Sequence, residues 1–235
     1  MKKFALITGT GGGIGRATAE LLLKENFFVF GYSRTNRITH PNFIFTQIDL
    51  SNITEVQRLV LPIINSVNVL LINNAATIGS IVPFDKKENS DIINEYNLNL
   101  VCPTILCRKF IATYINQKKL LINIGSGAAN SPIPSWSTYC AAKAGLDMLT
   151  KVIAEENHKN LKTFSIHPGI VDTNMQKTIR GADEDLFPLL AKFTAYHLEN
   201  ELETTTIAAR KIYYIIRNSN EFINNILSIR DINLK

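Results

Sequence analysis

Cysteine, charged residues and long apolar runs are all scarce in this sequence. Its 235 residues include three cysteines, Cys102, Cys107 and Cys140, an odd number without the spacing of a zinc or redox motif. Disulfide frameworks belong to oxidising compartments, so these cysteines indicate a reducing, cytoplasmic setting and no metal site. Charged residues make up 19% of the chain, below the usual share of about 25%. That shortage excludes a highly charged, disordered chain.

The sequence also lacks the signals of export and of nucleic-acid binding. No apolar run approaches the roughly 20 residues of a membrane span. The apolar run at residues 4–7 ends at once in glycine-rich sequence, so it is too short for a secretory signal. The net charge is +5, but Lys and Arg are scattered rather than interleaved with aromatic residues. We therefore expect no membrane and no nucleic-acid partner.

What the sequence does contain is a regular alternation of strand-like and helix-like segments. The expected strands are residues 4–7, 27–31, 43–48, 67–72, 120–124, 161–166 and 225–229. The expected helices are residues 16–24, 53–60, 90–114, 137–158 and 204–217. A capping box of Asn52 and Glu55 opens the helix at 53–60, and the helix at 90–114 is expected to be interrupted or kinked near Pro103. This alternation predicts a single α/β domain with a doubly wound (Rossmann), mostly parallel seven-stranded sheet and helices on both faces.

A glycine-rich segment follows the first expected strand and leads directly into the first helix. It reads Thr8-Gly9-Thr10-Gly11-Gly12-Gly13-Ile14-Gly15. Glycines let the backbone approach a pyrophosphate closely, and the helix amino end supplies free N–H groups and a positive dipole. The segment therefore predicts a dinucleotide-binding loop. A flexible turn without function is the alternative, which the position between strand and helix disfavours.

The second expected strand ends in Ser33 and Arg34, some twenty residues beyond the glycine loop. At this point NAD-dependent enzymes carry an acidic residue that binds the ribose hydroxyls. A hydroxyl and a guanidinium suit a 2′-phosphate instead, so the pair predicts NADP(H) as the cofactor. The alternative is a solvated loop arginine.

Ser126, Tyr139 and Lys143 form the candidate catalytic group. Ser126 follows the strand at 120–124, and Tyr139 and Lys143 lie one helical turn apart, on one face of the next helix. A nearby ammonium lowers the pKa of a phenol, so Tyr139 could protonate a carbonyl oxygen at working pH. Ser126 could hydrogen-bond the same oxygen. The alternative for the pair, whose spacing is weak evidence on its own, is a packed tyrosine beside an exposed lysine.

Six motifs in this order resemble the short-chain dehydrogenase/reductase family over essentially the full chain. They are Thr8-Gly9-(x)3-Gly13-Ile14-Gly15, Asn73-Asn74-Ala75-Ala76, Asn99, Ser126, Tyr139-(x)3-Lys143 and Pro168-Gly169-(x)3-Thr173. Residues 126–129, 136–148 and 168–176 are most similar to the sepiapterin reductase and benzil reductase group. Two departures stand out: Ala76 replaces the usual glycine, and glycines follow Thr10 where NADPH-dependent members often have a basic residue.

The resemblance implies an NADPH-dependent carbonyl reductase acting on a small ketone or dicarbonyl. It implies that Tyr139 donates a proton, Lys143 also holds the nicotinamide ribose, Ser126 polarises the carbonyl, and Asn99 fixes a water next to Lys143. Further implied cofactor contacts are Thr8, Gly9, Gly13, Ile14 and Gly15 at the pyrophosphate, Asp49 and Leu50 at the adenine, Asn74 and Ala75 at the ribose, and Pro168, Gly169, Ile170 and Thr173 at the carboxamide end.

The least regular stretch, residues 176–203, is interpreted as a substrate lid, with an ordinary surface insertion as the alternative. Substrate contacts are expected from Ser126, Trp136, Tyr139 and Met175, although Trp136 could equally just close its loop. The family resemblance implies a dimer or tetramer. Two other functions stay open: an NAD-dependent alcohol dehydrogenase, and a protein that senses NADPH without turnover. The full set of catalytic residues argues against the sensor.

Overall fold

One parallel sheet lies at the centre of the structure, a computed structural model that describes residues 2–234. Its strands lie in the spatial order β3-β2-β1-β4-β5-β6-β7, and each neighbouring pair is parallel. The strand bounds are β1 (Lys3–Thr8), β2 (Phe27–Ser33), β3 (Phe43–Gln47), β4 (Asn68–Asn73), β5 (Lys118–Ile124), β6 (Leu161–His167) and β7 (Ile226–Ser228). The predicted seven-stranded, doubly wound sheet is confirmed, with strand ends shifted by one or two residues.

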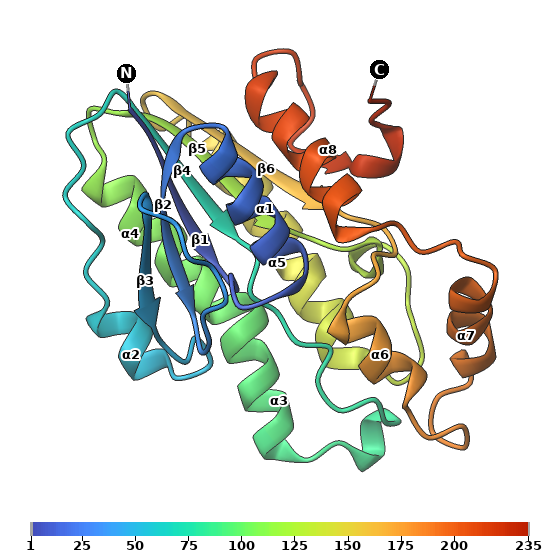
Figure 1. Cartoon of the computed structure of the whole chain (residues 1–235). Coiled ribbons are helices and arrows are strands. Elements are labelled where there is room, and N and C mark those ends of the chain that lie inside the picture. Colours follow the sequence, from blue (N-terminus) through green and yellow to red (C-terminus); the bar gives the residue numbers. More distant parts are fainter. Residues whose placement is uncertain (1, 235) are drawn as a thin grey trace.

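Helices cover both faces of this sheet. The helices of the described residues are α1 (Gly13–Lys24), α2 (Ile53–Arg58), α3 (Asn89–Tyr96), α4 (Cys102–Thr113), α5 (Ser137–Glu155), α6 (Asn174–Arg180), α7 (Leu190–Leu198) and α8 (Thr205–Arg217), of which α6 and α7 do not cover the sheet. Figure 1 shows α1 and α8 in front of the sheet and α4 and α5 behind it. This is the two-sided arrangement that right-handed strand–helix–strand crossovers produce.

Both faces of the sheet are apolar. Successive side chains of a strand point to opposite sides, so a strand that is apolar throughout contributes to the core on each face. In β1, Ala5 and Ile7 pack into the core that α1 and α8 cover. Leu6 packs into the opposite core, together with Leu106 and Phe110 of α4. The continuous apolar runs of the sequence therefore correspond to strands buried on both faces, as expected for a parallel sheet.

The long helix predicted over residues 90–114 is interrupted close to Pro103, as expected. A π-helical turn at Asn97–Val101 joins α3 to α4. Pro103 follows this turn by two residues and has no N–H with which to continue the hydrogen-bond series of the helix. The predicted irregularity near Pro103 is therefore present as a π turn, and it contains the buried Asn99.

The capping box predicted for α2 is present in part. The Asn52 side chain accepts hydrogen bonds from the N–H groups of Thr54 and Glu55, as an N-cap does. Glu55 bonds the side-chain amide of Asn52 and the N–H of Asp49 instead of the Asn52 backbone. The helix ends at Arg58, two residues before the predicted end.

The stretch expected to be irregular, residues 176–203, contains most of α6 and all of α7. Figure 1 shows these two helices (orange) standing outside the body formed by the sheet and its covering helices. They enclose a separate apolar cluster in which Phe187 and Phe193 pack against Trp136 and Tyr139. This segment therefore has a small core of its own, and that core includes the aromatic end of α5.

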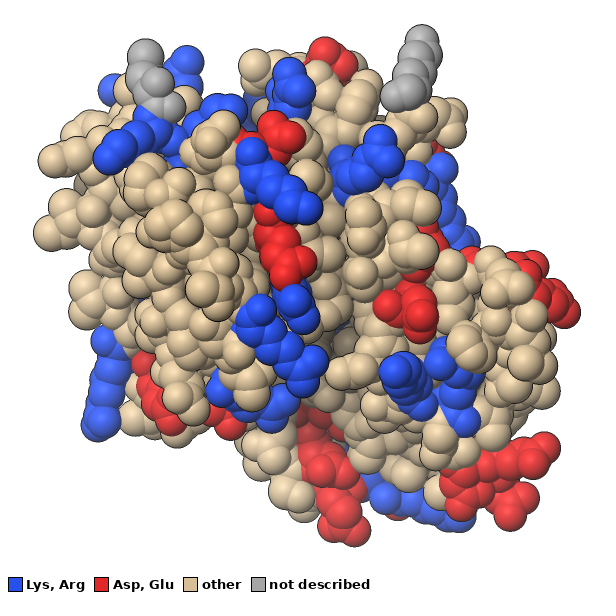
Figure 2. All heavy atoms as spheres, viewed as in Figure 1, with Lys and Arg blue, Asp and Glu red and all other residues tan. Residues whose placement is uncertain are grey.

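Three observations concern the expectations about nucleic acid, membranes and metal ions. On the face drawn in Figure 2, Lys and Arg side chains are interspersed with Asp and Glu. Between residues 2 and 234, none of the helices combines the length and the apolar character that crossing a bilayer requires. In the same range, no three His, Cys, Asp or Glu side chains lie together in a way that could hold a metal ion.

Candidate active site

The carboxyl ends of β1 and β4 lie side by side at the point where the strand order reverses. In open α/β sheets this switch point is where ligands bind. The loop after β1 carries the glycines, and Asn74 and Ala75 follow β4. The Thr8 hydroxyl joins the two loops by accepting hydrogen bonds from the N–H groups of Asn74 (2.9 Å) and Ala75 (3.0 Å). The Thr8 side chain therefore connects the end of β1 to the backbone of the loop after β4.

The glycines of the loop are required by close packing. Gly9 has φ +74°, and a Cβ there would lie 2.7 Å from the side-chain nitrogen of Asn74. That nitrogen donates to the carbonyl oxygens of Thr8 (3.0 Å) and Gly9 (3.4 Å). A Cβ on Gly15 would overlap the same amide. Asn74 thus supports the turn from beneath, a role that the sequence prediction of a ribose contact did not anticipate.

The start of α1 is built for an anion. Its N-cap is Gly12, so no side chain occupies the N–H groups of the first turn, and that turn contains no acidic residue. A Cβ on Gly12 would meet open space. The methyl group of Thr173, at the start of α6, lies 3.4 Å from where a Cβ on Gly13 would be, so the segment after β6 closes on this loop. Uncapped N–H groups at a helix amino end fit a pyrophosphate.

The candidate adenosine end lies beyond β2 and β3. Arg34 is exposed, whereas Ser33 is buried and its hydroxyl donates to the carbonyl oxygen of Thr35 at 2.7 Å. The two residues of the predicted pair are therefore not equally available to a phosphate, because the Ser33 hydroxyl already donates its hydrogen to Thr35. Hydrogen bonds from Ser51 lower the pKa of Asp49, and the charge of Arg34 lowers it further.

The remaining predicted contacts divide between buried and accessible positions. The Leu50 side chain is buried in the core, so only its backbone can contact an adenine. Ile14 is half-buried, as are Pro168 and Ile170, whereas Gly169 is exposed with φ +69°. The carbonyl oxygen of Ile170 accepts a hydrogen bond from the N–H of Glu203 at 2.9 Å.

Ser126, Tyr139 and Lys143 come together at the carboxyl end of β5. Ser126 is the N-cap of a short 3-10 turn, where its hydroxyl accepts from the N–H of Ala128. The Lys143 ammonium donates to the carbonyl oxygen of Ile124 at 2.7 Å and lies 5.6 Å from the centre of the Tyr139 ring. The predicted shared face of α5 is therefore present, with the ammonium held over the aromatic ring.

The protonation of this group differs from the sequence prediction. Burial raises the pKa of Tyr139 to about 12, the nearby Ser126 hydroxyl opposes this rise, and Cys140 adds to it. Burial lowers the pKa of Lys143 to about 8, and the charge of Asp147 opposes that change. The predicted lowering of the Tyr139 pKa is wrong for this structure, because removing the phenolate from water outweighs the other effects.

Both polar atoms of the buried Asn99 side chain have a hydrogen-bond partner, as buried amides require. Its side-chain oxygen accepts from the Thr77 N–H at 2.9 Å, and its side-chain nitrogen donates to the Thr77 carbonyl oxygen at 2.9 Å. These bonds hold the loop after β4 against the π turn. The predicted water beside Lys143 stays a prediction.

The sequence reasoning missed a polar cluster next to Lys143, the candidate catalytic lysine. Asp147, one turn beyond Lys143 on α5, bonds the His167 ring at 2.8 Å and accepts from the Ser165 hydroxyl at 2.5 Å. A carboxylate four residues after a lysine on a buried helix face was the available signal. Sequence reasoning also missed Glu95, a buried acid four residues before Asn99.

The expected substrate contacts lie at the edge of the outer apolar cluster. Trp136 is buried, stacks on Phe187 with ring centres 5.7 Å apart, and meets Tyr139 edge-on at 5.8 Å. Met175 is half-buried against the same cluster. Trp136 therefore closes its loop by packing, and its predicted contact with substrate stays a prediction.

The sheet order, the open glycine loop at its switch point and the adjacent Ser126, Tyr139 and Lys143 define the class: a dinucleotide-binding α/β protein. A family model described as short chain dehydrogenase matches residues 3–184. The chain belongs to the short-chain dehydrogenase/reductase family. It is accordingly an oxidoreductase of the family whose members act on carbonyl and alcohol groups with nicotinamide cofactors.

Two curated relatives show the resemblance predicted within that family. The benzil reductase ((S)-benzoin forming) of Bacillus cereus is 34% identical over 229 residues, covering 89% of this chain and 92% of the relative. The sepiapterin reductase of Rattus norvegicus is 31% identical over 154 residues, covering 63% of this chain and 58% of the relative. The predicted likeness to the benzil and sepiapterin reductase group is confirmed.

Solved structures show the same fold. A short chain dehydrogenase/reductase from Saccharomyces cerevisiae has a TM-score of 0.83 at 20% identity, covering 97% of this chain and 96% of that one. 4-Hydroxyisoleucine dehydrogenase, complexed with NADH, has a TM-score of 0.78 at 25% identity, covering 96% of each chain. Serine dehydrogenase, complexed with NADP⁺, has a TM-score of 0.81 at 19% identity, covering 96% of this chain and 93% of that one.

Proposed function

We propose that this protein is an NADPH-dependent carbonyl reductase acting on a small aromatic ketone or dicarbonyl of the benzil or sepiapterin type. The observation that carries the proposal is the arrangement of Ser126, Tyr139 and Lys143 beside the switch point of the sheet. The similarity to benzil reductases over nearly the full chain supports the substrate class.

Each residue of the group has one task in this reaction. Tyr139, with a pKa of about 12, is protonated at neutral pH and can therefore give its proton to the carbonyl oxygen. Ser126 lies close enough to the phenol to orient the same oxygen by a second hydrogen bond. Lys143, with a pKa of about 8, carries its positive charge near neutral pH and favours the negative charge that develops on the phenol.

The cofactor would lie across the switch point, with its pyrophosphate at the start of α1. Bound there, NADPH supplies the hydride, and the protein supplies position and electrostatics. Asn74 and Thr8 hold the loop in shape, and Thr173 closes over it. We assign the preference for NADPH to Arg34, because an exposed guanidinium suits a 2′-phosphate.

Two further features belong to the proposal. The segment 176–203 would act as the substrate lid, since its apolar cluster packs directly on Trp136 and Tyr139. Helices α3, α4 and α5 would pair with a second copy of the chain, a proposal supported by the exposed apolar side chains of Ile93 on α3 and of Met148 and Val152 on α5.

Turnover with NADPH and NADH tests the function directly. Purified protein should reduce benzil with loss of NADPH absorbance, and Tyr139→Phe should lower kcat by a factor of about 100 or more. Arg34→Ala should raise the KM for NADPH about tenfold and change the KM for NADH little, because charge-assisted hydrogen bonds contribute about 1.5–3 kcal/mol.

Arg58→Ala is the matched control, because Arg58 is also exposed but lies at the far end of α2. It should leave both KM values unchanged. Full activity of Tyr139→Phe would remove the proton-donor assignment. Equal use of NADH, with Arg34→Ala having no effect, would favour an NAD-dependent alcohol dehydrogenase instead.

A further inference from the structure

A buried ion pair that no part of the proposed reaction uses lies next to the catalytic helix. The Lys87 ammonium and the Glu95 carboxylate are 2.9 Å apart, and their side chains are 0% and 3% exposed. Burying two charges costs more free energy than the attraction between them readily returns. The presence of this pair is therefore weak evidence that it stabilises the fold. Its contacts indicate a different role.

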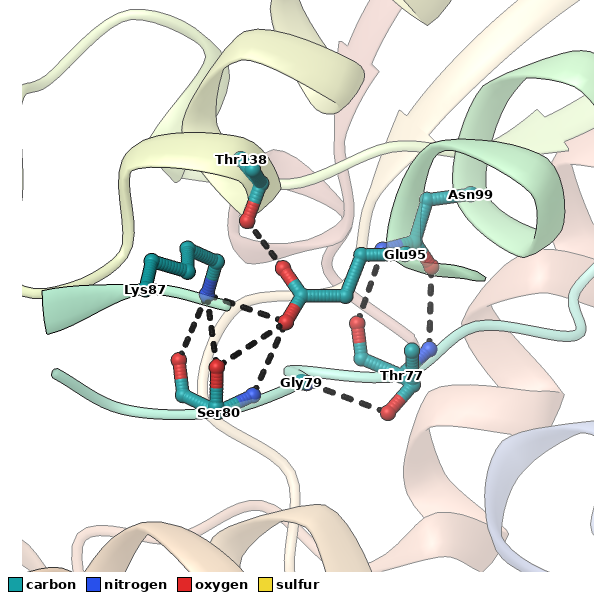
Figure 3. Close-up of polar contacts among 7 residues, drawn as sticks. All are labelled: Thr77, Gly79, Ser80, Lys87, Glu95, Asn99 and Thr138. Atoms are coloured by element: carbon teal, nitrogen blue, oxygen red, sulfur yellow. Dashed lines mark hydrogen bonds and ion pairs between the residues drawn. The ribbon is translucent and has the colours of Figure 1, made fainter. Parts of the chain in front are cut away.

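The carboxylate of Glu95 connects three separate segments, as Figure 3 shows. One oxygen accepts from the Ser80 N–H at 2.9 Å and from the Lys87 ammonium. The other oxygen accepts from the hydroxyl of Thr138. Lys87 itself donates to the carbonyl oxygen of Ser80 at 2.7 Å and to its hydroxyl at 3.0 Å. The loop after β4, the segment before α3 and the first turn of α5 thus meet at one carboxylate.

The loop after β4 is shaped to fit against this carboxylate. Gly79 has φ +71°, a conformation that favours glycine. A Cβ at this position would overlap the Glu95 carboxyl group. The N–H of Gly79 also donates to the Thr77 hydroxyl at 3.1 Å. The backbone here therefore approaches Glu95 more closely than any other residue type would allow.

Each end of this cluster is adjacent to a residue of the candidate active site. Thr138 immediately precedes Tyr139 on α5. Thr77, at the other end of the loop, holds both polar atoms of the Asn99 side chain. Glu95 and Asn99 lie on one continuous helical segment, interrupted only in its hydrogen-bond pattern by the π turn. The cluster therefore links Asn99 to Tyr139 through directly bonded groups.

We propose that Glu95, with Lys87 as its counter-ion, is a positioning residue that sets the placement of Tyr139 relative to the loop after β4. The proposal rests on the proposed function, because it assigns to the pair a part in the step that Tyr139 performs. The Glu95 side chain is buried, and the proposal assigns it no contact with the substrate or the cofactor. Its effect should therefore fall on kcat and not on cofactor affinity.

The test compares Glu95→Gln, Thr138→Val and their combination, assayed with benzil and NADPH. Glu95→Gln removes the charge at nearly constant shape, and Thr138→Val removes only the hydroxyl that ties α5 to the carboxylate. Each should lower kcat about tenfold while the Kd for NADPH, from its fluorescence, changes less than about threefold. Because both act through one link, the combination should be no worse than the stronger single variant.

Two controls separate the possible failures. Lys119→Met removes another buried ammonium, one that donates to backbone carbonyls at the amino end of β5, whereas Ser126 follows its carboxyl end. Four backbone carbonyl groups lose their donor, so Lys119→Met should change the melting temperature but leave kcat unchanged. Loss of activity in Tyr139→Phe, measured in the same series, establishes that the reaction uses the proposed donor.

If Tyr139→Phe is inactive while Thr138→Val and Glu95→Gln keep full kcat, the positioning role is refuted and the proposed function stands. If Tyr139→Phe is fully active, the proposed function itself fails. Should Glu95→Gln not fold, Thr138→Val decides the question, since it leaves the ion pair intact: a normal kcat there overturns the inference, and a tenfold loss with unchanged NADPH affinity supports it.

Discussion

Replacing Lys143 with methionine should make the protein more stable at neutral pH while making it inactive. The Lys143 ammonium is buried, and burial lowers its pKa from the ordinary 10.5 to about 8. Each pH unit between the folded and unfolded pKa corresponds to about 1.4 kcal/mol, so the charged lysine destabilises the fold by about 3 kcal/mol at pH 7. Losing the charge-assisted hydrogen bond to the Ile124 carbonyl oxygen offsets about 1.5–3 kcal/mol of that. A net stabilisation of up to about 1.5 kcal/mol is therefore expected.

The pH dependence of this difference gives the sharper measurement. Because the folded pKa of Lys143 is below the unfolded one, the unfolded chain holds a proton that the folded chain has lost at intermediate pH. The free energy of unfolding of the wild type therefore rises with pH across that window. The advantage of Lys143→Met should shrink by about 2 kcal/mol between pH 8 and pH 10. Contributions from the buried tyrosines cancel, since both proteins have them.

Urea denaturation of both proteins, without added cofactor, measures the two curves. Lys151→Met is the control, because Lys151 is exposed two turns further along α5 and should change stability little at any pH. A Lys143→Met variant that is less stable than the wild type at pH 7, by an amount independent of pH, would refute the reasoning. It would mean that the ammonium is well solvated or well paired in the folded protein.

Three more substitutions test the crevice and the lid. In Gly15→Ala the new methyl would lie 2.5 Å from the carbonyl oxygen of Gly9, so NADPH affinity should fall more than tenfold; near-normal binding in a fluorescence titration would contradict the loop geometry. Thr8→Val leaves two half-buried N–H groups without their acceptor and should lower the free energy of unfolding by about 2–4 kcal/mol in urea denaturation; a loss below about 1 kcal/mol would show that water replaces the hydroxyl. Phe187→Ala removes the ring stacked on Trp136, so we expect a loss of about 3–5 kcal/mol in the lid core and a higher KM for benzil, and an unchanged KM would argue against a lid.

The local patterns of the sequence determined the layout of the sheet and the site. Continuous apolar runs separated by helical periodicity predict strands that are buried on both faces, and β1 and β4 are buried in that way. Glycines between a strand and a helix predict an open helix amino end, which the structure places at the switch point. The four-residue spacing of Tyr139 and Lys143 predicts one shared helix face, which α5 provides.

Properties that depend on burial could not be predicted in this way. Proximity to a lysine predicts a lower pKa for Tyr139, yet the side chain is buried in the apolar cluster that includes Phe187 and Phe193, and desolvation raises its pKa. The use of the Ser33 hydroxyl by Thr35 depends on a loop turn that composition does not specify. The pairing of Lys87 with Glu95 brings together the loop after β4 and the helices α3 and α5. No spacing along the chain predicts this pairing.

The sequence by itself therefore determined which residues lie along each element, because helix and strand periods are set by the backbone and repeat over a few residues. Only the tertiary structure decided which charges lose their water and which groups replace it. Desolvation depends on everything packed around a group, including segments far away in the chain, so the partners of Glu95 and Asp147 and the protonation of Tyr139 were decided only in the folded molecule.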